Sequence, residues 1–525
     1  MNSFVNREAQ LRLVDEAFRA LLKKELLLRS PIIEFYGAGG IGKTTLLKKV
    51  EQKCNEERVP SIWADASQSD PNIFSHTIIE QAKKYRTGAM PGEGGGDPLH
   101  QSVDATRALL RQGPVVMLLD EVDTTDEERV RWIEAMLKDL VDESKLLVVM
   151  TSKSTVSFQQ ERSVARKLTS MPLQLLDRSS CEAYLDSIDN QIAPGLRDII
   201  FEWTRGYPLA MQVMTEAVSA GRDPRSTQDQ KDILDIIKDQ VINRNVLARV
   251  DQEKRAQYYA SLQLLSVPRR FNLVIMQELI EQFAPELSRE SSLAYFALPR
   301  EIQQATEVLR WNVPRAGYSV DAPIRNIFLL ELKMEQPEDY RELHTFLAET
   351  NRRLATEVSG TDRLRYLREY LYHSAISAES QNISSLLQQV IKQITAERPE
   401  AFLQFYEEFI QDEELKEALG QHVTLAISLM HSHLARIYRQ LATRTIGAQR
   451  LRYWREFFIH SIHDPEVTDL SYMLQETLTA LTQEVSPEDV IKLFRDLARD
   501  EQFRASLGTK LDTFLLFLQE NHLEG

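Results

Sequence analysis

The chain has 525 residues, of which 43% are hydrophobic and 27% are charged, and its formal net charge is −15. This length exceeds what one hydrophobic core organises, so several domains are expected. The negative charge argues against a broad electrostatic surface for nucleic acid, which would need an excess of Lys and Arg on one face.

The first ten residues, MNSFVNREAQ, lack the pattern of a secretory signal, and no apolar stretch reaches the length of a membrane span. We therefore expect a cytoplasmic protein. The two cysteines, Cys54 and Cys181, exclude a disulfide framework and a cysteine-based zinc site. Both are expected to be small core residues.

The first predicted strand covers residues 32–36 and leads into a glycine loop followed by an amphipathic helix. The loop meets the pattern G-x-x-x-x-G-K-[ST], in which glycines let backbone N–H groups face phosphate oxygens. Lys43 is expected to reach the β- and γ-phosphates, and the Thr44 hydroxyl is expected to ligate Mg²⁺. The predicted ATP or ADP contacts are Gly37, Ala38, Gly39, Gly40, Ile41, Gly42, Lys43, Thr44 and Thr45.

A weaker strand is predicted near residues 61–64, and the glycine-rich segment 87–97 is expected to be a surface loop. The next apolar run, 115–119, ends in Asp120 and Glu121. Asp120 is the candidate for indirect Mg²⁺ coordination, and Glu121 is the candidate for polarising a water that attacks the γ-phosphate. The alternative is that Asp120 only ends a strand and Glu121 only opens an exposed acidic loop.

The apolar run 146–150 ends in Thr151, Ser152 and Lys153, whose polar side chains could face the γ-phosphate. A weak strand near residues 173–175 completes about five parallel strands alternating with helices. The sequence therefore predicts a three-layer α/β P-loop NTPase domain over residues 1–176.

The C-terminal part is predicted to be helical from residue 334 to residue 525, with an internal repeat. Residues 363–374 recur at 450–461, a spacing of 87, and later matches are spaced by 88. Stacked repeats form an α-solenoid, here expected to be TPR-like and to bind partners; the alternative is an extension that only stabilises the ATPase. His373 and His460 invite a metal site, but they lie in separate copies without clustered acids, so a role in packing the repeats is favoured.

Four motifs together resemble the STAND class of signalling NTPases, which includes the NB-ARC and NACHT families. They are the loop GAGGIGKTTL, the acidic strand VVMLLDEVD, the strand LVVMTSK and the segment RGYPLA at 205–210, which is similar to the GxP motif. The resemblance implies that Pro208 packs on the adenine. The opening FVNRE is similar to an FVGRE entry segment, with Asn6 in place of glycine, which implies that Val5 and Arg7 line the base.

The resemblance covers roughly the first 330 residues and implies a small helical domain at 177–250 and a winged helix at 251–333. Two positions depart from the family pattern. Lys153 stands where many relatives carry an arginine that senses the γ-phosphate. Asp321 stands at the histidine of a Met-His-Asp motif, where its carboxylate is expected to repel a diphosphate.

The leading hypothesis is an ATP/ADP-dependent molecular switch with slow Mg²⁺-dependent hydrolysis. The C-terminal repeats would receive a trigger, the activated form would homo-oligomerise, and a separate effector protein would give the output, because the phosphate loop begins near residue 37.

Two alternatives remain open. A DNA-acting ATPase would require a basic recognition helix, but residues 271–278 are apolar and acidic, so a nucleic acid partner is disfavoured. A nucleotide-binding scaffold would release no phosphate.

Overall fold

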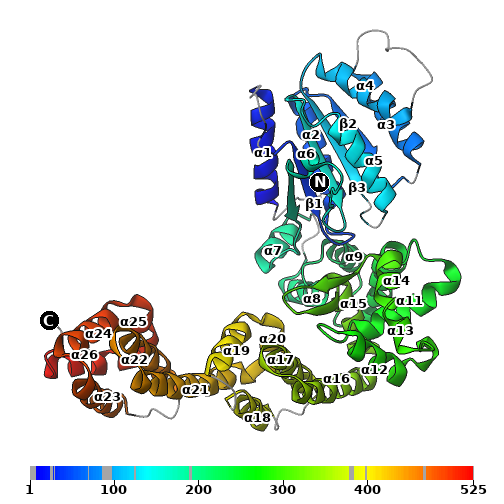
Figure 1. Cartoon of the computed structure of the whole chain (residues 1–525). Helices are drawn as coiled ribbons and strands as arrows, with labels where there is room; N and C mark the ends of the chain where they lie inside the picture. Colours follow the sequence, from blue (N-terminus) through cyan, green and yellow to red (C-terminus); the bar gives the residue numbers. More distant parts are fainter. Residues whose placement is uncertain are drawn as a thin grey trace. The chain divides into compact units, whose positions relative to one another are not determined.

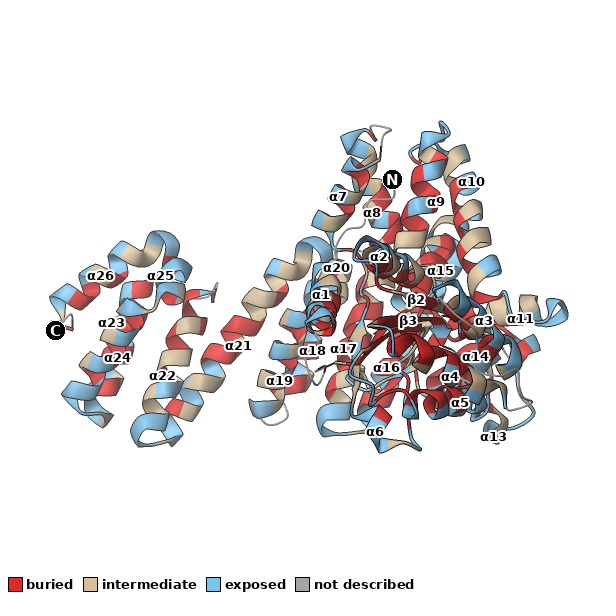
Figure 2. Ribbon diagram, turned by 90° about the horizontal axis from the view of Figure 1, so that it is seen from above, coloured by how far each residue is buried: buried red, intermediate tan, exposed pale blue. Residues whose placement is uncertain are grey.

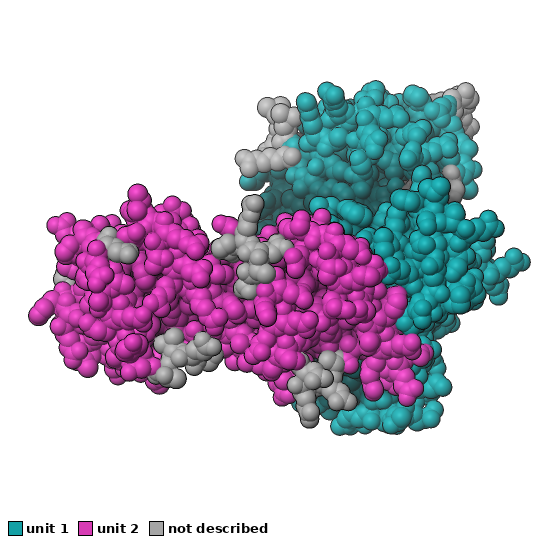
Figure 3. All heavy atoms as spheres, turned by 60° about the horizontal axis from the view of Figure 1, so that its bottom comes forward, with its two compact units in different colours: residues 1–336 teal, residues 337–525 magenta. Residues whose placement is uncertain are grey.

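The computed structural model in Figure 1 describes residues 7–23, 28, 30–68, 70–85, 97–122, 124, 126–188, 192–377, 383–395, 399–464 and 469–523. The chain divides into two compact units, Met1–Gln336 and Pro337–Gly525, which Figure 3 colours separately. Across these described ranges, no helix combines the length and the apolar character that a bilayer crossing requires.

A five-stranded parallel sheet forms the centre of the first unit. Its strands are β1 (Ile32–Tyr36), β2 (Ser61–Asp65), β3 (Val115–Val122), β4 (Leu146–Ser152) and β5 (Leu168–Pro172). They lie in the order β2-β3-β4-β1-β5, and all neighbours are parallel. The predicted α/β class with about five parallel strands is confirmed.

The last strand lies a few residues before the expected position. We predicted a strand near residues 173–175, but β5 ends at Pro172, and Leu168 pairs with Ile32 of β1. β5 is an edge strand with half-buried and exposed residues, so its apolar signal is weaker than that of the more apolar residues that follow it.

Helices cover both faces of this sheet, which explains why the central strands are continuous apolar runs. β2 and β3 are largely buried in Figure 2, and one core cluster joins Met117 of β3 to Phe74 and Ile133 of the covering helices. The helices are α1 (Glu8–Leu22), α2 (Lys43–Glu56), α3 (Pro71–Lys84), α4 (Pro98–Leu110), α5 (Glu127–Lys138) and α6 (Arg162–Ala165). Cys54 and Cys181 are buried, as expected for core residues.

The predicted surface loop at 87–97 lies outside the described residues except for Asp97. This aspartate caps α4 by accepting a hydrogen bond from the backbone N–H of Leu99 at 3.3 Å.

The remainder of the first unit is mainly helical. Its elements are α7 (Arg178–Asp186), α8 (Pro194–Thr204), α9 (Pro208–Ser219), α10 (Thr227–Ile237), the π-helix η1 (Lys238–Val246), α11 (Gln252–Leu265), α12 (Leu273–Phe283), the 3₁₀ turn η2 (Pro285–Leu287), α13 (Ser292–Tyr295), α14 (Leu298–Thr306), the strands β6 (Leu309–Asn312) and β7 (Gly317–Val320), and α15 (Ala322–Glu335). β6 and β7 form an antiparallel hairpin. The division of the chain into domains at residues 176, 250 and 333 stays a prediction.

Within the described residues of the second unit, two copies of a five-helix repeat are followed by one more helix. The first copy holds α16 (Pro337–Glu357), α17 (Gly360–Ser377), α18 (Ile383–Thr395), α19 (Pro399–Gln411), α20 (Glu413–Leu419) and the 3₁₀ turn η4 (Gly420–His422). The second copy holds α21 (Val423–Arg444), α22 (Gly447–Ile462), α23 (Leu470–Glu484), α24 (Pro487–Arg499), α25 (Glu501–Leu507) and η5 (Gly508–Lys510), before α26 (Leu511–Glu520). The predicted helical character of the C-terminal part is confirmed.

The same side-chain contacts occur in both copies, which supports the sequence repeat. Arg368 lies 3.6 Å from Asp412, and Arg455 forms an ion pair with Asp500 at the equivalent positions. Both aspartates also cap the helix that follows them. The inserted residue lies between α23 and α24, because the starts of α18 and α23 keep the spacing of 87 while those of α19 and α24 have the spacing of 88. A one-residue insertion between helices leaves both helix interiors in register.

The two singled-out histidines each pair with a histidine from the preceding helix. Nδ1 of His373 lies 2.9 Å from Nδ1 of His344, and Nδ1 of His460 lies 2.7 Å from Nδ1 of His431. Within the described part of the chain, no group of three or more His, Cys, Asp or Glu side chains could hold a metal ion. Packing within each repeat, as favoured from the sequence, accounts for these histidines.

The second pair makes the C-terminal unit sensitive to acid. Burial, with the neighbouring His463, lowers the pKa of His431 to about 4, although Asp464 opposes this shift; burial and His431 lower that of His460 to about 3. The unfolded chain therefore binds protons near pH 6 while the folded pair stays neutral, so stability falls as the pH drops below about 7.

We expect the two histidines together to reduce the free energy of unfolding by about 1 kcal/mol between pH 7 and pH 6. Urea unfolding of the full chain at both pH values measures this loss. His431→Gln should show a smaller difference between the two pH values, and an equal difference would contradict the assignment.

Candidate functional site

The glycine loop lies between β1 and α2, as the sequence pattern requires. Gly40 and Gly42 have φ angles of 74° and 98°, in the region that side chains rarely adopt. A Cβ atom at Gly40 would also lie 2.5 Å from the Tyr207 hydroxyl oxygen. Glycine at these positions therefore allows the left-handed turns of the loop and, at Gly40, the close approach of Tyr207.

The Lys43 side chain bends back over this loop. Its Nζ donates hydrogen bonds to the carbonyl oxygens of Gly37 and Ala38, at 2.8 and 2.9 Å. Burial, followed by the charge of Lys153, lowers the pKa of Lys43 to about 8. An anion beside this ammonium would reverse the shift, so the loop is electrostatically prepared for phosphate.

The acidic end of β3 is fixed by a residue of β4. Thr151 donates a hydrogen bond from Oγ1 to Oδ1 of Asp120 at 2.6 Å and accepts one from the backbone N–H of Glu121 at 2.9 Å. Glu121 has a φ of 55°, and the strand register shifts between Leu119 and Val122. This left-handed conformation costs about 1 kcal/mol and is typical of functional sites.

A cavity of about 280 Å³ opens over the loop. Nine predicted site residues line it: Arg7, Gly40, Ile41, Gly42, Lys43, Thr44, Thr45, Glu121 and Pro208. Gly37, Ala38, Gly39, Asp120 and Lys153 lie outside its lining, and the predicted contact Val5 lies outside the described residues. The lining also includes four residues that we did not predict, Leu176, Tyr184, Leu209 and Gln212.

The predicted base-lining residues Arg7 and Pro208 reach the cavity from opposite parts of the unit. Nη2 of Arg7 donates a hydrogen bond to the Ile41 carbonyl oxygen at 3.0 Å, and burial lowers the pKa of this arginine. Pro208 occupies the first turn of α9, where its missing N–H costs nothing. The two residues therefore belong to segments far apart in the sequence that meet at one cavity.

Two contacts join the loop to the helical part of the unit. The buried Tyr207 hydroxyl donates a hydrogen bond to the Gly39 carbonyl oxygen. Asn245, from η1, lies so close that a Cβ atom at Gly39 would be 2.3 Å from its Oδ1. η1 is a π-helix of nine residues, and π-helices are rare but occur frequently at functional sites. The periodicity of the sequence did not predict it.

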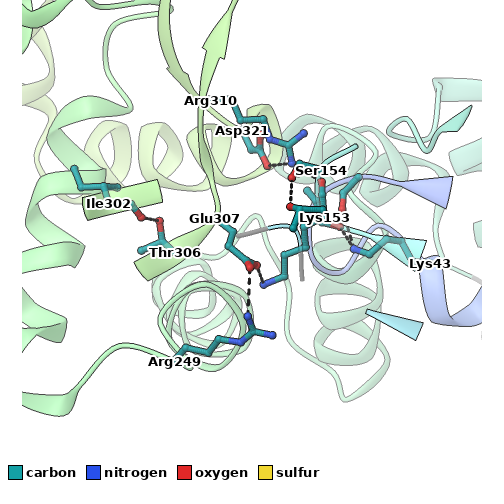
Figure 4. Close-up of polar contacts among 12 residues, drawn as sticks. Lys43, Lys153, Ser154, Arg249, Ile302, Thr306, Glu307, Arg310 and Asp321 are labelled. Atoms are coloured by element: carbon teal, nitrogen blue, oxygen red, sulfur yellow. Dashed lines mark hydrogen bonds and ion pairs between the residues drawn. The ribbon is translucent and has the colours of Figure 1, made fainter. Parts of the chain in front are cut away.

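Asp321, which we expected to repel a diphosphate, is paired with an arginine (Figure 4). Its carboxylate forms a paired contact with the Arg310 guanidinium, with Nε–Oδ1 and Nη2–Oδ2 distances of 3.0 and 3.1 Å. Burial raises the pKa of Asp321 to about 6, although the charges of Arg310 and Lys43 oppose the shift. The expected repulsion of a diphosphate is therefore reduced, because the carboxylate already has a cationic partner.

The donor set fits a magnesium-bound nucleotide. The loop and the start of α2 supply backbone N–H groups and an ammonium, which suit phosphate oxygens. The Thr44 hydroxyl and the carboxylates of Asp120 and Glu121 are oxygen ligands of the kind that Mg²⁺ prefers. The apolar side chains of Leu176, Pro208 and Leu209 in the cavity wall suit a flat base.

Residues 12–174 match the family model described as the NB-ARC domain. The match covers the sheet, the glycine loop and the acidic strand, so the predicted STAND-class P-loop NTPase is confirmed for this part of the chain. The comparison with curated proteins gave no match.

Three solved structures are similar at low identity. The ORC1 protein of Aeropyrum pernix in complex with DNA is 16% identical, with 65% of this chain and 95% of that chain covered and a TM-score of 0.39. A STAND protein with a tetratricopeptide repeat sensor from Pyrococcus horikoshii is 12% identical, with 100% and 79% covered and a TM-score of 0.33. AMPPCP-bound DnaA from Aquifex aeolicus is 18% identical, with 57% and 95% covered and a TM-score of 0.31. At these scores the likeness carries no argument about what this chain binds.

Proposed function

We propose that this chain, whose residues 12–174 are of the NB-ARC type, is an ATP/ADP-dependent molecular switch of the STAND type. One observation carries the proposal. The cavity is walled by the glycine loop, the start of α2 and Glu121 of β3, and also by residues of α7 and α9, which belong to the helical part of the unit. A bound nucleotide would therefore touch both parts, and its identity could bias their arrangement.

The site residues have the following proposed roles. Lys43 and the loop amides hold the phosphates, while Thr44 and Asp120 hold Mg²⁺, the latter indirectly. When bound, Mg²⁺ would neutralise charge on the phosphate oxygens. Glu121 lines the cavity and would polarise the attacking water, with Thr151 fixing its backbone. Slow ATP hydrolysis is the resulting proposed activity.

The other parts of the chain have a proposed place in the same switch. Residues 177–250 and 251–333 would act as a small helical domain and a winged helix that respond to the nucleotide. The repeats of the second unit would act as a TPR-like arm that receives a trigger, and a separate effector protein in the cytoplasm would give the output. α12 supports this use over DNA binding, because its sequence LVIMQELIEQF contains no basic residue.

The size of the particle tests the proposal. We expect the protein to be monomeric with ADP and Mg²⁺. With AMPPCP and Mg²⁺ we expect a larger assembly once the monomeric form is destabilised, which is the purpose of the truncation. Light scattering after gel filtration, on the wild type and on a variant truncated after residue 336, measures the two masses.

A scaffold without switching predicts the same mass with both nucleotides in both proteins, and that result would contradict the proposal. Phosphate release, measured alongside, separates a switch that hydrolyses ATP from one that only exchanges nucleotide.

A further inference from the structure

Lys153 lies beside the phosphate loop but does not line the cavity. It follows directly after β4, the strand that lies between β1 with its loop and β3 with its acids. Its charge is the second cause, after burial, of the lowered pKa of Lys43, so the two ammonium groups repel each other. Figure 4 shows the Lys153 side chain directed toward Glu307.

Glu307 neutralises the ammonium group of Lys153. Its Oε2 forms an ion pair with Nζ of Lys153, and its Oε1 lies 3.3 Å from Nη1 of Arg249. Glu307 has a left-handed φ of 58° at the end of α14, and its side chain is 9% exposed. A glutamate in this conformation costs about 1 kcal/mol relative to the usual region, so surrounding contacts must hold it there.

A second contact from the same part of the chain holds the backbone of Lys153. Nη2 of Arg310 donates a hydrogen bond to the Lys153 carbonyl oxygen at 2.8 Å, and the same guanidinium pairs with Asp321. The segment from α14 to the start of α15 therefore places two carboxylates, those of Glu307 and Asp321, near the cations of the phosphate site (Figure 4).

We propose that Glu307, by neutralising Lys153, withholds a cation that a γ-phosphate would use, and that it thereby sets a preference for nucleoside diphosphate over triphosphate. This inference rests on the proposed function of the cavity. The β-phosphate would be held by Lys43 and the loop amides, whereas the ion pairs of Glu307 are with Lys153 and Arg249. A γ-phosphate adds negative charge, so it would compete with Glu307 for Lys153 and would be repelled by the Glu307 carboxylate.

The competition works in both directions. If the Glu307–Lys153 contact weakens ATP binding by a given factor, bound ATP weakens that contact by the same factor. ATP would then release the segment that begins at Glu307, whereas ADP would leave it in place. The Glu307 carboxylate would thus couple the conformation of this segment to the identity of the bound nucleotide.

The test compares dissociation constants for ADP and AMPPCP, each with Mg²⁺, by calorimetry on the full chain. We expect Glu307→Gln to raise the affinity for AMPPCP relative to ADP by at least about tenfold, since it keeps the shape of the side chain and removes its charge. Lys153→Met should remove this effect, so that adding Glu307→Gln to it changes the ratio by less than about twofold.

Glu301→Gln is the matched control. Glu301 lies on α14, which ends just before Glu307, and it pairs with Arg289 at 2.7 Å instead of with Lys153, so the affinity ratio of this variant should equal that of the wild type. If Glu307→Gln changes both affinities equally, or neither, the inference fails while the nucleotide site stands. If the wild type binds neither nucleotide, the proposed function fails first and the inference fails with it.

Discussion

Lys43→Ala is expected to weaken binding of both ADP and AMPPCP by about 100- to 1,000-fold, because a hydrogen bond to a charged group contributes about 1.5–3 kcal/mol and the ammonium should make more than one. This is the largest effect on binding that we expect from a single substitution. The side chain is 5% exposed, and its ammonium hydrogen-bonds to two loop carbonyls. Its removal therefore takes charge from the site and a support from the loop.

Lys48→Ala provides the control for this substitution. Lys48 lies on the same helix and is exposed, so its loss should leave both dissociation constants unchanged. Calorimetric titration of the three proteins measures the effect, and circular dichroism checks that α2 is retained. Equal affinities in Lys43→Ala and Lys48→Ala would show that the nucleotide binds elsewhere.

Gly206→Ala is expected to lower the free energy of unfolding of the first unit by about 3–4 kcal/mol, as the sum of a strained conformation and a steric overlap. Gly206 has a φ of 74°, and a Cβ atom there would lie 1.9 Å from the backbone oxygen of Leu176. The Gly206 carbonyl oxygen also accepts a hydrogen bond from the Leu176 N–H at 2.9 Å. The backbone must move, because neither partner is a flexible side chain.

This movement should also reach the nucleotide site, since Leu176, which makes the contact, and Pro208, two residues after Gly206, both line the cavity. Gly221→Ala is the control, because Gly221 has a φ of 93° and no neighbour within 4 Å of an added Cβ. The free energy of unfolding of this variant should fall by only about 1 kcal/mol, which is the cost of alanine in the left-handed conformation. Urea unfolding and ADP titration compare the two variants, and equal losses would mean that the Leu176 contact is unimportant.

The NTPase part of the fold could be predicted because its signals are local. The strand before Gly37, the loop and the helix that begins at Lys43 are consecutive in the sequence, and each residue type has a required duty. Asp120 could be found in the same way, since it ends a buried apolar run. The weak edge strand β5 was placed imprecisely because it buries only part of its surface.

The helical repeat could be predicted as a repeat but not as a set of five helices. The spacing of 87 shows that two copies exist, whereas the helix ends depend on packing between neighbours. The partner of His460 illustrates this difference. Its contact with His431 needs two helices to lie side by side, and nothing in the spacing of one histidine specifies the other.

The sequence by itself determined the loop, the acidic strand, the class of the NTPase part and the existence of the repeat. Only the tertiary structure decided that Tyr207 contacts the loop, that Asn245 packs against Gly39 and that Glu307 neutralises Lys153. The contact between Arg310 and Lys153 joins positions 157 residues apart. Local patterns report the conformation of neighbouring residues, but the choice among many charged partners is made by packing, which brings one carboxylate within reach of one ammonium.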